Sequence, residues 1–553
     1  MCGLRTFCNS VANMSFLPKT NYDVVDKIWS SEKEELQFGE DLSIGEIIFQ
    51  EMVRHPKSVA QISDSEKTIL LREDLLNNAI RIATFMRKLG LTETDIVGVI
   101  ARNTTHVAAV AYACFFNGIA MHTLNSAYLP EIIEKLFLNT KPRIIFCDGD
   151  EYEKIRSTTA KLNVRIVTMR NHPAGVLSIQ EVLKTPAEEG FKPTPLKQGS
   201  THPLAILSTS GTTGTPKAVI VSNCRTILSG LTKVTTSDIQ YVSSSLDWAS
   251  CLWTVVSSGV FSTKRIVSEE PFDPSETLRI IEEYKVTYVL QSPAQVAAIV
   301  SCRDFEKANL HSLRYYYFGG GRCTAEVQKR LRQKLGKDII QFCYGASELG
   351  SLYCVNWHYD AKPNSVGRPS PGYKVKILND QGDKLGPNEE GEVFVYNGSF
   401  WPGYYGNPEA TKGVYRENWY QTGDLGYVDV DGFVYIVERK KDLLKYHSNK
   451  YYPHDLEELI SQMPGVVEAC VFGIWNVENG DEAAAIIAKK PNVQLSEKDV
   501  IDFVAQHAST KFLRLHAGCL IANDLKRSPN GKTNRAANKE YFIRQKGIQI
   551  QNH

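Results

Sequence analysis

In the first third of the chain, segments with the apolar spacing of a helix alternate with short apolar segments typical of buried strands. The stretches SIGEIIFQEMV (43–53) and LREDLLNNAIRIATFMRKLG (71–90) carry apolar residues at helical spacing, and the second helix is expected to stop at Gly90. TDIVGVIA (94–101), PRIIFCD (142–148) and VRIVTM (164–169) have the length and apolar content of buried strands, and a further helix is expected from Thr105. From about Ser43 to Arg170, this order predicts a parallel sheet covered by helices.

A second cycle of the same kind runs from Pro203 to about Gly345. PLAIL (203–207) and KAVIVS (217–222) flank a polar loop, and RIVSE, ETLRIIEEYK and VTYVLQS (265–292) predict a strand, a helix and a strand. LRYYYFGGG (313–321) and DIIQFCYGASE (338–348) are strands that each run into a glycine-containing loop. Loops at strand ends are where open α/β sheets bind ligands.

The pattern changes to short alternating strands at about Gly367. The pair Asp-Gly at 431–432 lies between two alternating runs and predicts a hairpin in an antiparallel β-subdomain. From about Lys440 the chain returns to mixed α/β, in a segment of about a hundred residues that is long enough for a separate small domain. The predicted fold is therefore α/β, with two α/β subdomains and a β-subdomain in a large N-terminal domain and a small α+β C-terminal domain.

Length and charge narrow the class of protein. A chain of 553 residues is too long for one hydrophobic core and suggests two to four units. Its net charge is +1, which disfavours nucleic acid as the main partner. The 12 cysteines include no C-x-x-C pair, so buried thiols in a reducing compartment are expected.

The most apolar window, HVAAVAYACFFNGIAMHTL (106–124), contains two histidines and an Asn-Gly pair. It predicts a buried helix that enters a turn, and no integral membrane segment. The N-terminus lacks the long apolar run of a secretory signal, and the C-terminus lacks the Ser-Lys-Leu address of a peroxisomal protein. A cytoplasmic location is therefore expected, with the peroxisome as the alternative.

The loop STSGTTGTPKAVIVSN (208–223) concentrates hydroxyls and glycines before a single lysine. It is not a Walker loop, because Pro216 precedes Lys217 and no Ser or Thr follows that lysine. Its hydroxyls, its glycines and the charge of Lys217 still suit a polyphosphate. Taken alone, the loop fits a solvated surface segment equally well.

Four later loops carry chemistry that complements a phosphate loop. YGASELG (344–350) offers an aromatic face and a carboxylate suited to Mg²⁺, and YQTGDLG (420–426) places an aspartate in a glycine turn, suited to two ribose hydroxyls. VERKKDLLKY (437–446) holds four cations, and SPNGKTNR (528–535) presents a lysine on a turn. Each of these loops alone also fits a solvated turn.

In this order, and with GYYGNPEAT (403–411) and DGFVYIVERKKDLLKY (431–446), the loops resemble those of the adenylate-forming (ANL) superfamily. The resemblance runs from about residue 40 to 540 and is nearest to the insect luciferase-like and 4-coumarate-CoA-ligase-like branch. It implies an N-terminal extension (1–40), an AMP-binding adenylation domain (41–437) and a mobile C-terminal domain (438–545). The implied ligands are ATP, Mg²⁺, coenzyme A and a small-molecule carboxylic acid, while the oligomeric state is left open.

The resemblance also assigns site residues. Nucleotide-binding positions lie in the phosphate loop, in two strand-end loops and in the β-subdomain: Ser208, Thr209, Ser210, Gly211, Thr212, Thr213, Gly214, Lys217, Gly319, Gly320, Gly321, Tyr344, Gly345, Glu348, Asp424 and Arg439. Tyr344 is expected to stack on adenine, Glu348 to serve the magnesium ion and Asp424 to bind the ribose. Ser347 is expected near the α-phosphate as a catalytic residue.

Two lysines are expected to act in turn, because the C-terminal domain of this superfamily rotates about a hinge just before Arg439. One orientation brings Lys532 to the substrate carboxylate and the α-phosphate, and the other brings in Lys445. The hinge residue is Glu438 here, where the superfamily usually has Asp or Lys. A serine, Ser448, replaces the usual glycine after Lys445, which puts the second half-reaction in doubt.

The acyl-pocket stretch SSLDWASCLW (244–253) departs from the usual pattern. Trp248 is a candidate gating ring, but Asp247 is unusual beside an apolar acyl site. Either the acid is polar or bears an amino group, or Asp247 faces solvent. We expect Asp247 to face solvent, because a buried unpaired carboxylate is costly.

The predicted function is the ATP-dependent activation of a carboxylic acid, fatty or aryl, to an acyl-adenylate, followed by thioester formation with coenzyme A. Two alternatives stay open on the sequence. A luciferase-type monooxygenase would share the adenylation site, and a degenerate paralogue would bind nucleotide or acyl ligand without turnover.

Overall fold

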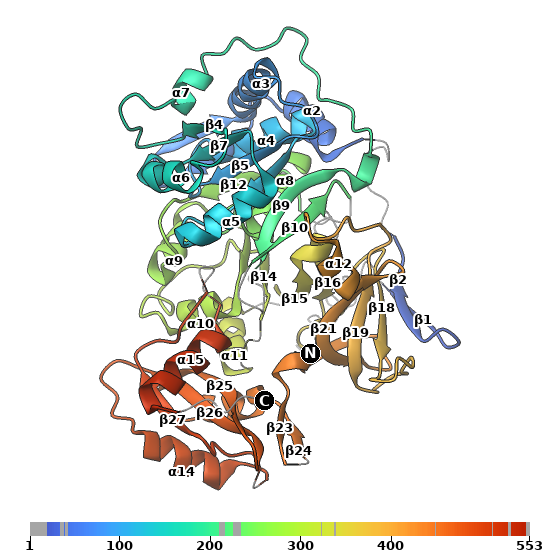
Figure 1. Ribbon diagram of the computed structural model, residues 1–553, viewed down its shortest axis with the longest axis vertical. Helices are drawn as coiled ribbons and strands as arrows, with labels where there is room; N and C mark the ends of the chain where they lie inside the picture. Colours follow the sequence, from blue (N-terminus) through green and yellow to red (C-terminus); the bar gives the residue numbers. More distant parts are fainter. Residues whose placement is uncertain are drawn as a thin grey trace, which may run out of the picture.

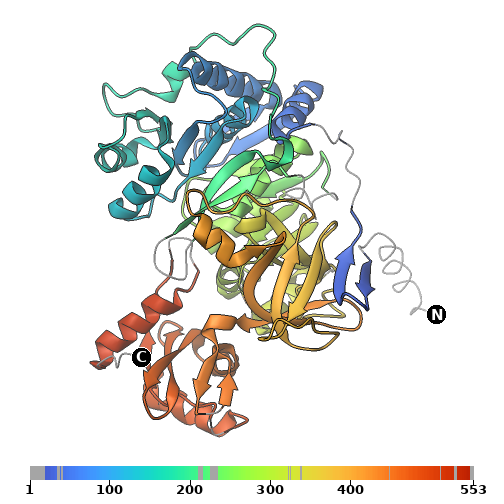
Figure 2. The ribbon, with the colours of Figure 1, turned by 45° about the vertical axis from the view of Figure 1, so that its right-hand side comes forward.

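A computed structural model of the chain describes residues 19–33, 38, 42–209, 216–224, 234–321, 323, 325–336, 339–447, 449–510, 512–528 and 532–548. These residues form a large N-terminal domain with three β-sheets and a small C-terminal domain with a fourth (Figure 1). The N-terminal sheet lies at one end of the molecule and the C-terminal domain at the other, with the central sheet between them, as both views show (Figures 1 and 2). The predicted α/β fold is confirmed.

The N-terminal sheet is parallel except for its last strand, β10, which runs antiparallel to β9. In spatial order, its strands are β10 (Lys217–Ser222), β9 (Pro203–Thr209), β6 (Ala120–Thr123), β5 (Ile96–Ile100), β7 (Ile144–Cys147) and β8 (Arg165–Thr168).

The central sheet is parallel from β15 to β3 and has antiparallel pairs at both ends. In spatial order, its strands are β17 (Arg368–Pro369), β16 (Ser351–Asn356), β15 (Ile340–Ala346), β14 (Tyr315–Gly319), β13 (Tyr288–Gln291), β11 (Ile239–Tyr241), β12 (Lys264–Val267), β3 (Val59–Ser63) and β4 (Thr68–Leu71).

Each of these sheets takes strands from the other half of the sequence. The hairpin β3–β4 precedes every strand of the N-terminal sheet, yet it pairs with β12 in the central sheet. In return, β9 and β10 come from the second βαβ cycle, yet β9 pairs with β6 of the N-terminal sheet and β10 pairs with β9. The two cycles seen in the sequence therefore do not correspond to two separate sheets.

Helices fill the space between the two sheets and cover their outer faces. Helices α2 (Ile44–Arg54), α3 (Arg72–Lys88), α4 (Val107–Asn117) and α8 (Ala249–Val260) share one hydrophobic core with strands of both sheets. The outer helices are α5 (Pro130–Thr140) and α6 (Tyr152–Thr158) on the N-terminal sheet, α9 (Pro274–Glu283), α10 (Pro293–Ser301) and α11 (Ala325–Leu335) on the central sheet, and the short α7 (Ile179–Val182) in a loop.

The window 106–124 contains a buried helix that enters a turn, as predicted, and then continues into β6. Every side chain of α4 is buried, and the helix ends at Gly118, whose φ of +64° suits glycine. Within the described residues, no helix combines the length and the apolar character that crossing a membrane requires.

The third sheet is the antiparallel β-subdomain expected after Gly367, and its Asp-Gly hairpin at 431–432 joins β21 to β22. Its strands are β1 (Thr20–Asp23), β2 (Ile28–Ser31), β18 (Lys374–Leu378), β19 (Gly391–Tyr396), β21 (Trp419–Val428) and β20 (Tyr415–Arg416), with β22 (Val434–Arg439) beside β21. Helix α12 (Pro408–Val414) precedes β20. Strands β1 and β2 add residues from near the N-terminus to this sheet, which the sequence pattern did not predict.

The C-terminal domain has hydrophobic clusters on both faces of its sheet. Its strands are β24 (Asn449–Tyr451), β23 (Leu444–Tyr446), β26 (Gly480–Lys489) and β25 (Val466–Asn476), with β27 (Gly518–Ala522) beside β26. Helices α13 (Pro453–Ser461), α14 (Glu497–His507) and α15 (Arg535–Lys546) pack on this sheet.

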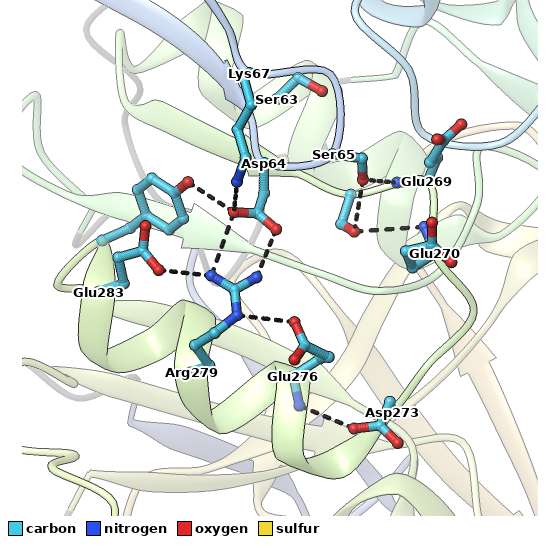
Figure 3. Close-up of polar contacts among 12 residues, drawn as sticks. Ser63, Asp64, Ser65, Lys67, Glu269, Glu270, Asp273, Glu276, Arg279 and Glu283 are labelled. Atoms are coloured by element: carbon cyan, nitrogen blue, oxygen red, sulfur yellow. Dashed lines mark hydrogen bonds and ion pairs between the residues drawn. The ribbon is translucent and has the colours of Figure 1, made fainter.

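An ionic network ties the β3–β4 hairpin to α9 (Figure 3). Asp64, which follows β3, accepts hydrogen bonds from Arg279 Nη2 at 2.6 Å and from the Tyr284 hydroxyl at 2.7 Å. Arg279 also pairs with Glu276 and Glu283 on its own helix. Burial alone would raise the pKa of Asp64, but these donors outweigh it and lower the pKa. The network fixes one end of the central sheet.

The substitution Asp64→Asn is expected to lower the free energy of unfolding by on the order of 1–2 kcal/mol at pH 7, because Arg279 loses a largely buried partner but is itself partly hydrated. Since the pKa of Asp64 is lower in the folded state, its contribution is present above the unfolded pKa of about 4 and is lost as pH falls through the folded value. Thermal unfolding at pH 7 and near pH 3, with the exposed Asp502→Asn as control, measures this. Equal midpoints of wild type and Asp64→Asn at pH 7 would contradict it.

Candidate active site

The candidate site lies where loops follow the carboxyl ends of parallel strands in the central sheet. Strands β14 and β15 end in the glycine run at 319–321 and in the turn η4 (Ser347–Leu349). The β9–β10 hairpin of the N-terminal sheet packs against η4, since a Cβ on Gly350 would lie 3.1 Å from Val221. The carboxyl ends of the strands are the usual ligand position in open α/β sheets.

The predicted phosphate loop spans the tip of the β9–β10 hairpin. Thr209 pairs with Lys217 in the register, so these two residues close the loop, while Ser210, Gly211, Thr212, Thr213 and Gly214 lie outside the described residues. The Ser208 hydroxyl lies 3.2 Å from Nε2 of the buried His122, whose Nδ1 lies 2.8 Å from the Thr140 hydroxyl. A buried histidine therefore holds the first strand of the loop.

Tyr404 contacts both Lys217, at the end of the phosphate loop, and Glu348, and it was not predicted as a site residue. Its hydroxyl donates a hydrogen bond to Glu348 Oε1 at 3.0 Å, and the Lys217 ammonium lies 4.7 Å from the centre of its ring. The backbone next to it is fixed by β10, where the Ile220 N–H donates to the Gly403 carbonyl at 3.1 Å. The motif GYYGNPEAT held the signal, but adjacent tyrosines in a motif do not indicate which one points at the site.

The three glycines at the end of β14 differ in how much space a side chain would have there. A Cβ on Gly319 would lie 2.4 Å from the Cys343 carbonyl oxygen, so close strand packing requires glycine there. Gly320 has a φ of +85°, and a Cβ on it would lie 3.1 Å from Lys532 Nζ. Gly321 has only Pro293 within 4 Å of such an atom. The run thus exposes backbone at the place that Lys532 reaches.

The loop after β15 presents an aromatic ring and two polar side chains. Tyr344 packs edge-on against Tyr353, with ring centres 5.4 Å apart, and its hydroxyl donates to Asp424 Oδ2 at 2.5 Å. Gly345 follows it in β15, and Ser347 and Glu348, in η4, are partly exposed. The structure therefore places Tyr344 and Glu348 beside groups from the β-subdomain.

Asp424 and Arg439 face each other across β21 and β22. Arg439 Nε lies 2.9 Å from Asp424 Oδ1, and Arg439 Nη1 donates to the Thr422 carbonyl at 2.9 Å. Burial raises the pKa of Asp424, and the charge of Arg439 opposes the rise. Oδ2 has accepted one hydrogen bond from Tyr344, and Oδ1 makes the ion pair with Arg439, so both oxygens retain acceptor capacity for a further hydroxyl donor.

Lys532 reaches this group of residues from the C-terminal domain. Its turn is held by an antiparallel bridge between Arg527 and Thr533, both of which bond to Glu468. The Lys532 ammonium lies 5.6 Å from the centre of the Trp248 ring. Burial lowers the pKa of Lys532 to about 8, with a further decrease from Arg439 that the carboxylates of Glu348 and Asp424 oppose.

The structure does not bring Lys445 to the same place. Lys445 is exposed on β23, where its backbone N–H donates to Asp481 Oδ2 at 3.0 Å. Ser448 lies outside the described residues. The predicted hinge residue Glu438 bonds to His454 Nδ1 at 3.2 Å and to the backbone N–H of Arg439 at 3.0 Å. Its role as a hinge stays a prediction.

The expectation that Asp247 faces solvent is wrong. The residue is only partly exposed, and its carboxylate accepts hydrogen bonds from the Ser245 hydroxyl and from Asn125 Nδ2, the latter at 3.1 Å. The expectation assumed that a buried carboxylate would be unpaired. Here two neutral donors from separate loops reduce the free-energy cost of burying it.

Together, the side chains at this site are suited to bind a nucleotide. Lys217, Arg439 and Lys532 supply positive charge for phosphates, Asp424 retains acceptor capacity for ribose hydroxyls, and Tyr344 supplies a ring at the carboxyl end of β15. Glu348 adds a hard oxygen ligand beside them.

Comparisons with known proteins agree with this geometry. A family model described as AMP-binding enzyme matches residues 48–405, and one described as AMP-binding enzyme C-terminal domain matches residues 455–532. The chain is 27% identical to luciferin 4-monooxygenase of Photuris pensylvanica over 92% of this chain and 96% of that protein. It is 24% identical to 4-coumarate–CoA ligase 1 of Arabidopsis thaliana over 93% and 95%.

Solved structures share the fold. ATP-bound MatB from Rhodopseudomonas palustris superposes with a TM-score of 0.81 at 23% identity, over 90% of this chain and 99% of that one. Because the first family model alone spans more than half of the 553 residues, and a second matches the C-terminal domain, the chain belongs to the AMP-binding enzymes of the adenylate-forming ANL superfamily.

Proposed function

We propose that the protein activates a small carboxylic acid with ATP and transfers the acyl group to the thiol of coenzyme A. The observation that carries the first step is the position of Lys532, which comes from the C-terminal domain and lies at Gly320, near Arg439, Glu348 and Asp424. A positive charge there faces the groups that suit ribose and phosphates, and it is the position from which a lysine can offset the repulsion between a carboxylate and an α-phosphate.

In the first step, an oxygen of the substrate carboxylate attacks the α-phosphorus and the bond to pyrophosphate breaks. Lys532 stabilises the charge that develops on the α-phosphate oxygens, and Lys217 stabilises the departing pyrophosphate. Ser347 and the backbone at 319–321 align the reactants, which lowers the entropic part of the barrier. Asp424 and Tyr344 hold the ribose and the base.

Glu348 is the residue proposed for Mg²⁺. Its Oε1 accepts a hydrogen bond from the Tyr404 hydroxyl at 3.0 Å, which fixes the direction of the carboxylate. A bound Mg²⁺ would neutralise phosphate charge, and a carboxylate that leaves room for phosphate oxygens suits its preference for oxygen ligands.

In the second step, the thiol gives up its proton to solvent, its sulfur attacks the acyl carbon, and AMP leaves as the C–O bond breaks. We assign this step to the orientation that brings in Lys445, which requires the C-terminal domain to rotate after Lys532 has acted. The similarity to 4-coumarate–CoA ligase over nearly the whole chain supports this choice. The similarity to luciferin 4-monooxygenase supports a second candidate, in which O₂ oxidises the adenylate.

Carboxylate-dependent exchange of labelled pyrophosphate into ATP, over a panel of acids, tests the first step. Exchange with at least one acid is expected, followed by thioester on addition of coenzyme A. Exchange without thioester would exclude the second step, and light emission with a luciferin would favour the oxygenase. Retained ATP binding without exchange for any acid would favour a binding protein.

Lys532→Ala is expected to reduce exchange by ~10²–10³-fold, because a donor to developing charge is lost. ATP binding, measured by calorimetry, should remain nearly intact. Lys526→Ala is the matched control, since that ammonium lies 4.8 Å from the Tyr541 ring, on the same domain, and should leave exchange unchanged. If Lys532→Ala catalysed pyrophosphate exchange at the wild-type rate, Lys532 would not have the role in adenylation that we assign to it.

The pH dependence of exchange provides an independent check. Lys532 acts as a cation, and its pKa is lowered to about 8, so kcat/KM for ATP should fall as pH rises above about 8. Lys532→Arg should be slower but should lose this alkaline decline, because a guanidinium stays protonated. An unchanged alkaline limb in Lys532→Arg would assign the decline to another group.

Tyr404→Phe is expected to raise the Mg²⁺ concentration for half-maximal exchange by about 3- to 10-fold, because Glu348 loses a hydrogen bond that directs its carboxylate. The ring under Lys217 stays, so the KM for ATP at saturating Mg²⁺ should change little. Tyr405→Phe is the neighbouring control. An altered KM for ATP with an unchanged Mg²⁺ requirement would contradict this division of roles.

A further inference from the structure

Two side chains of the C-terminal domain bind carboxylates of the β-subdomain. Lys440 follows β22 directly, and its ammonium lies 2.9 Å from Glu392 Oε2 and 3.1 Å from Asp380 Oδ1. The Tyr452 hydroxyl donates a hydrogen bond to Glu390 Oε1. We refer to the pairing of Lys440 with Glu392 and of Tyr452 with Glu390 as the docking contacts.

The contact of Lys440 with Glu392 involves a buried carboxylate. The Glu392 side chain is 7% exposed, and Gln421 Nε2 of β21 donates to its Oε1 at 2.8 Å, so that the other oxygen meets Lys440. Among the residues that the structure describes, Lys440 is the one cation paired with Glu392. A buried carboxylate that loses its cation is destabilised strongly, whereas an exposed pair such as Lys440 with Asp380 contributes little.

The contact of Tyr452 with Glu390 fixes the beginning of a helix. Burial and the hydrogen bond to Glu390 raise the pKa of Tyr452, so the phenol keeps its proton and donates to the carboxylate. Tyr452 is the N-cap of α13, and its ring stacks on that of His454 with centres 5.4 Å apart. The N-terminal end of α13 is therefore held on the β-subdomain.

An ion pair inside the C-terminal domain connects α13 to Lys532. Glu457 of α13 lies 3.0 Å from Nη2 of Arg535, which begins α15 three residues after Lys532. Burial raises the pKa of Glu457, and the charge of Arg535 opposes that rise. Because separating such a buried pair is unfavourable, the docking contacts and the turn that carries Lys532 are parts of one packed unit. Within this unit, Lys532 lies at Gly320 while the docking contacts are formed.

The hairpin that carries Lys445 also lies at the β-subdomain. The hydrogen bond and charge of Lys440 lower the pKa of Asp380, and the charges of Lys450 and Lys445, on β24 and β23, lower it further. The orientation that places Lys532 at the site therefore places Lys445 near the acidic segment that follows β18.

We propose that Lys440 and Tyr452 are positioning residues, which dock the C-terminal domain on the β-subdomain and so favour the orientation with Lys532 at the site. This inference rests on the two half-reactions proposed above. Lys440 lies two positions after the predicted hinge residue Glu438, so a rotation there separates Lys440 from Glu392. The strength of the docking contacts then determines how the domain is distributed between its two orientations.

The ratio of the two half-reactions tests this role. Tyr452→Phe and Lys440→Met should each lower the ratio of pyrophosphate exchange to thioester formation from preformed adenylate by about 3- to 10-fold, because a bond to a charged group is lost. A general loss of folded enzyme would lower both rates alike and leave the ratio unchanged. Lys440→Arg should restore the ratio. Tyr541→Phe is the control, since that ring packs on Lys526 within the C-terminal domain.

A double-variant cycle tests the pairing itself. Tyr452→Phe combined with Glu390→Gln should change the ratio no more than either substitution alone, because both remove the same hydrogen bond. Fully additive effects would show that the two residues act separately and would contradict the proposed pairing.

Energy transfer between fluorophores on unnatural amino acids at the exposed positions 409 and 502 reports the domain orientation without any acid or coenzyme A. The variant that carries both Tyr452→Phe and Lys440→Met should populate a second distance more than the wild type does. An unchanged distance distribution in that variant, or an unchanged ratio in the single variants, overturns the inference. If the wild type exchanges pyrophosphate with no acid, the proposed function fails, and energy transfer alone then decides whether the docking contacts hold the orientation.

Discussion

The site depends on a constraint of topology: the carboxyl ends of two parallel sheets must open toward one another. The chain meets it by exchanging strands, with β3–β4 placed in the central sheet and β9–β10 in the N-terminal sheet. This exchange puts the phosphate-loop hairpin beside the turn that holds Glu348. Helices α4 and α8 fill the space between the sheets with a shared core, so the relative position of their edges is set by close packing.

The charged side chains at the site are held in position by protein partners, and these partners leave some of their hydrogen-bonding positions open for a ligand. Asp424 is held by a hydrogen bond from Tyr344 to one carboxylate oxygen and by an ion pair with Arg439 at the other. Glu348 is held by Tyr404, which also lies under Lys217. Groups that are oriented before the ligand arrives do not have to reorganise during the reaction, and this is the main source of electrostatic catalysis.

Local chemistry was predictable from the sequence where one segment carries its own signal. The buried helix at α4, the Asp-Gly hairpin at 431–432 and the glycine that ends β14 follow from composition and turn preference over a few residues. The exchange of strands between sheets was not predictable, because pairing between residues far apart leaves no local pattern. For the same reason the role of Tyr404 and the contact between Asp247 and Asn125 were missed: each joins two segments that lie more than 50 residues apart in the sequence.

The position of Arg439 links nucleotide binding to domain orientation. Arg439 contacts Asp424, the proposed ribose ligand, and the preceding residue, Glu438, bonds to His454 on the C-terminal domain. A ligand that alters the hydrogen bonds of Asp424 therefore acts on the segment that connects the two domains. In this structure Lys532 lies at Gly320, whereas Lys445 is exposed on β23 of the same domain. Under the proposed mechanism, pyrophosphate would be released while Lys532 is in the site. AMP would be released later, after the connecting segment has let Lys445 replace Lys532.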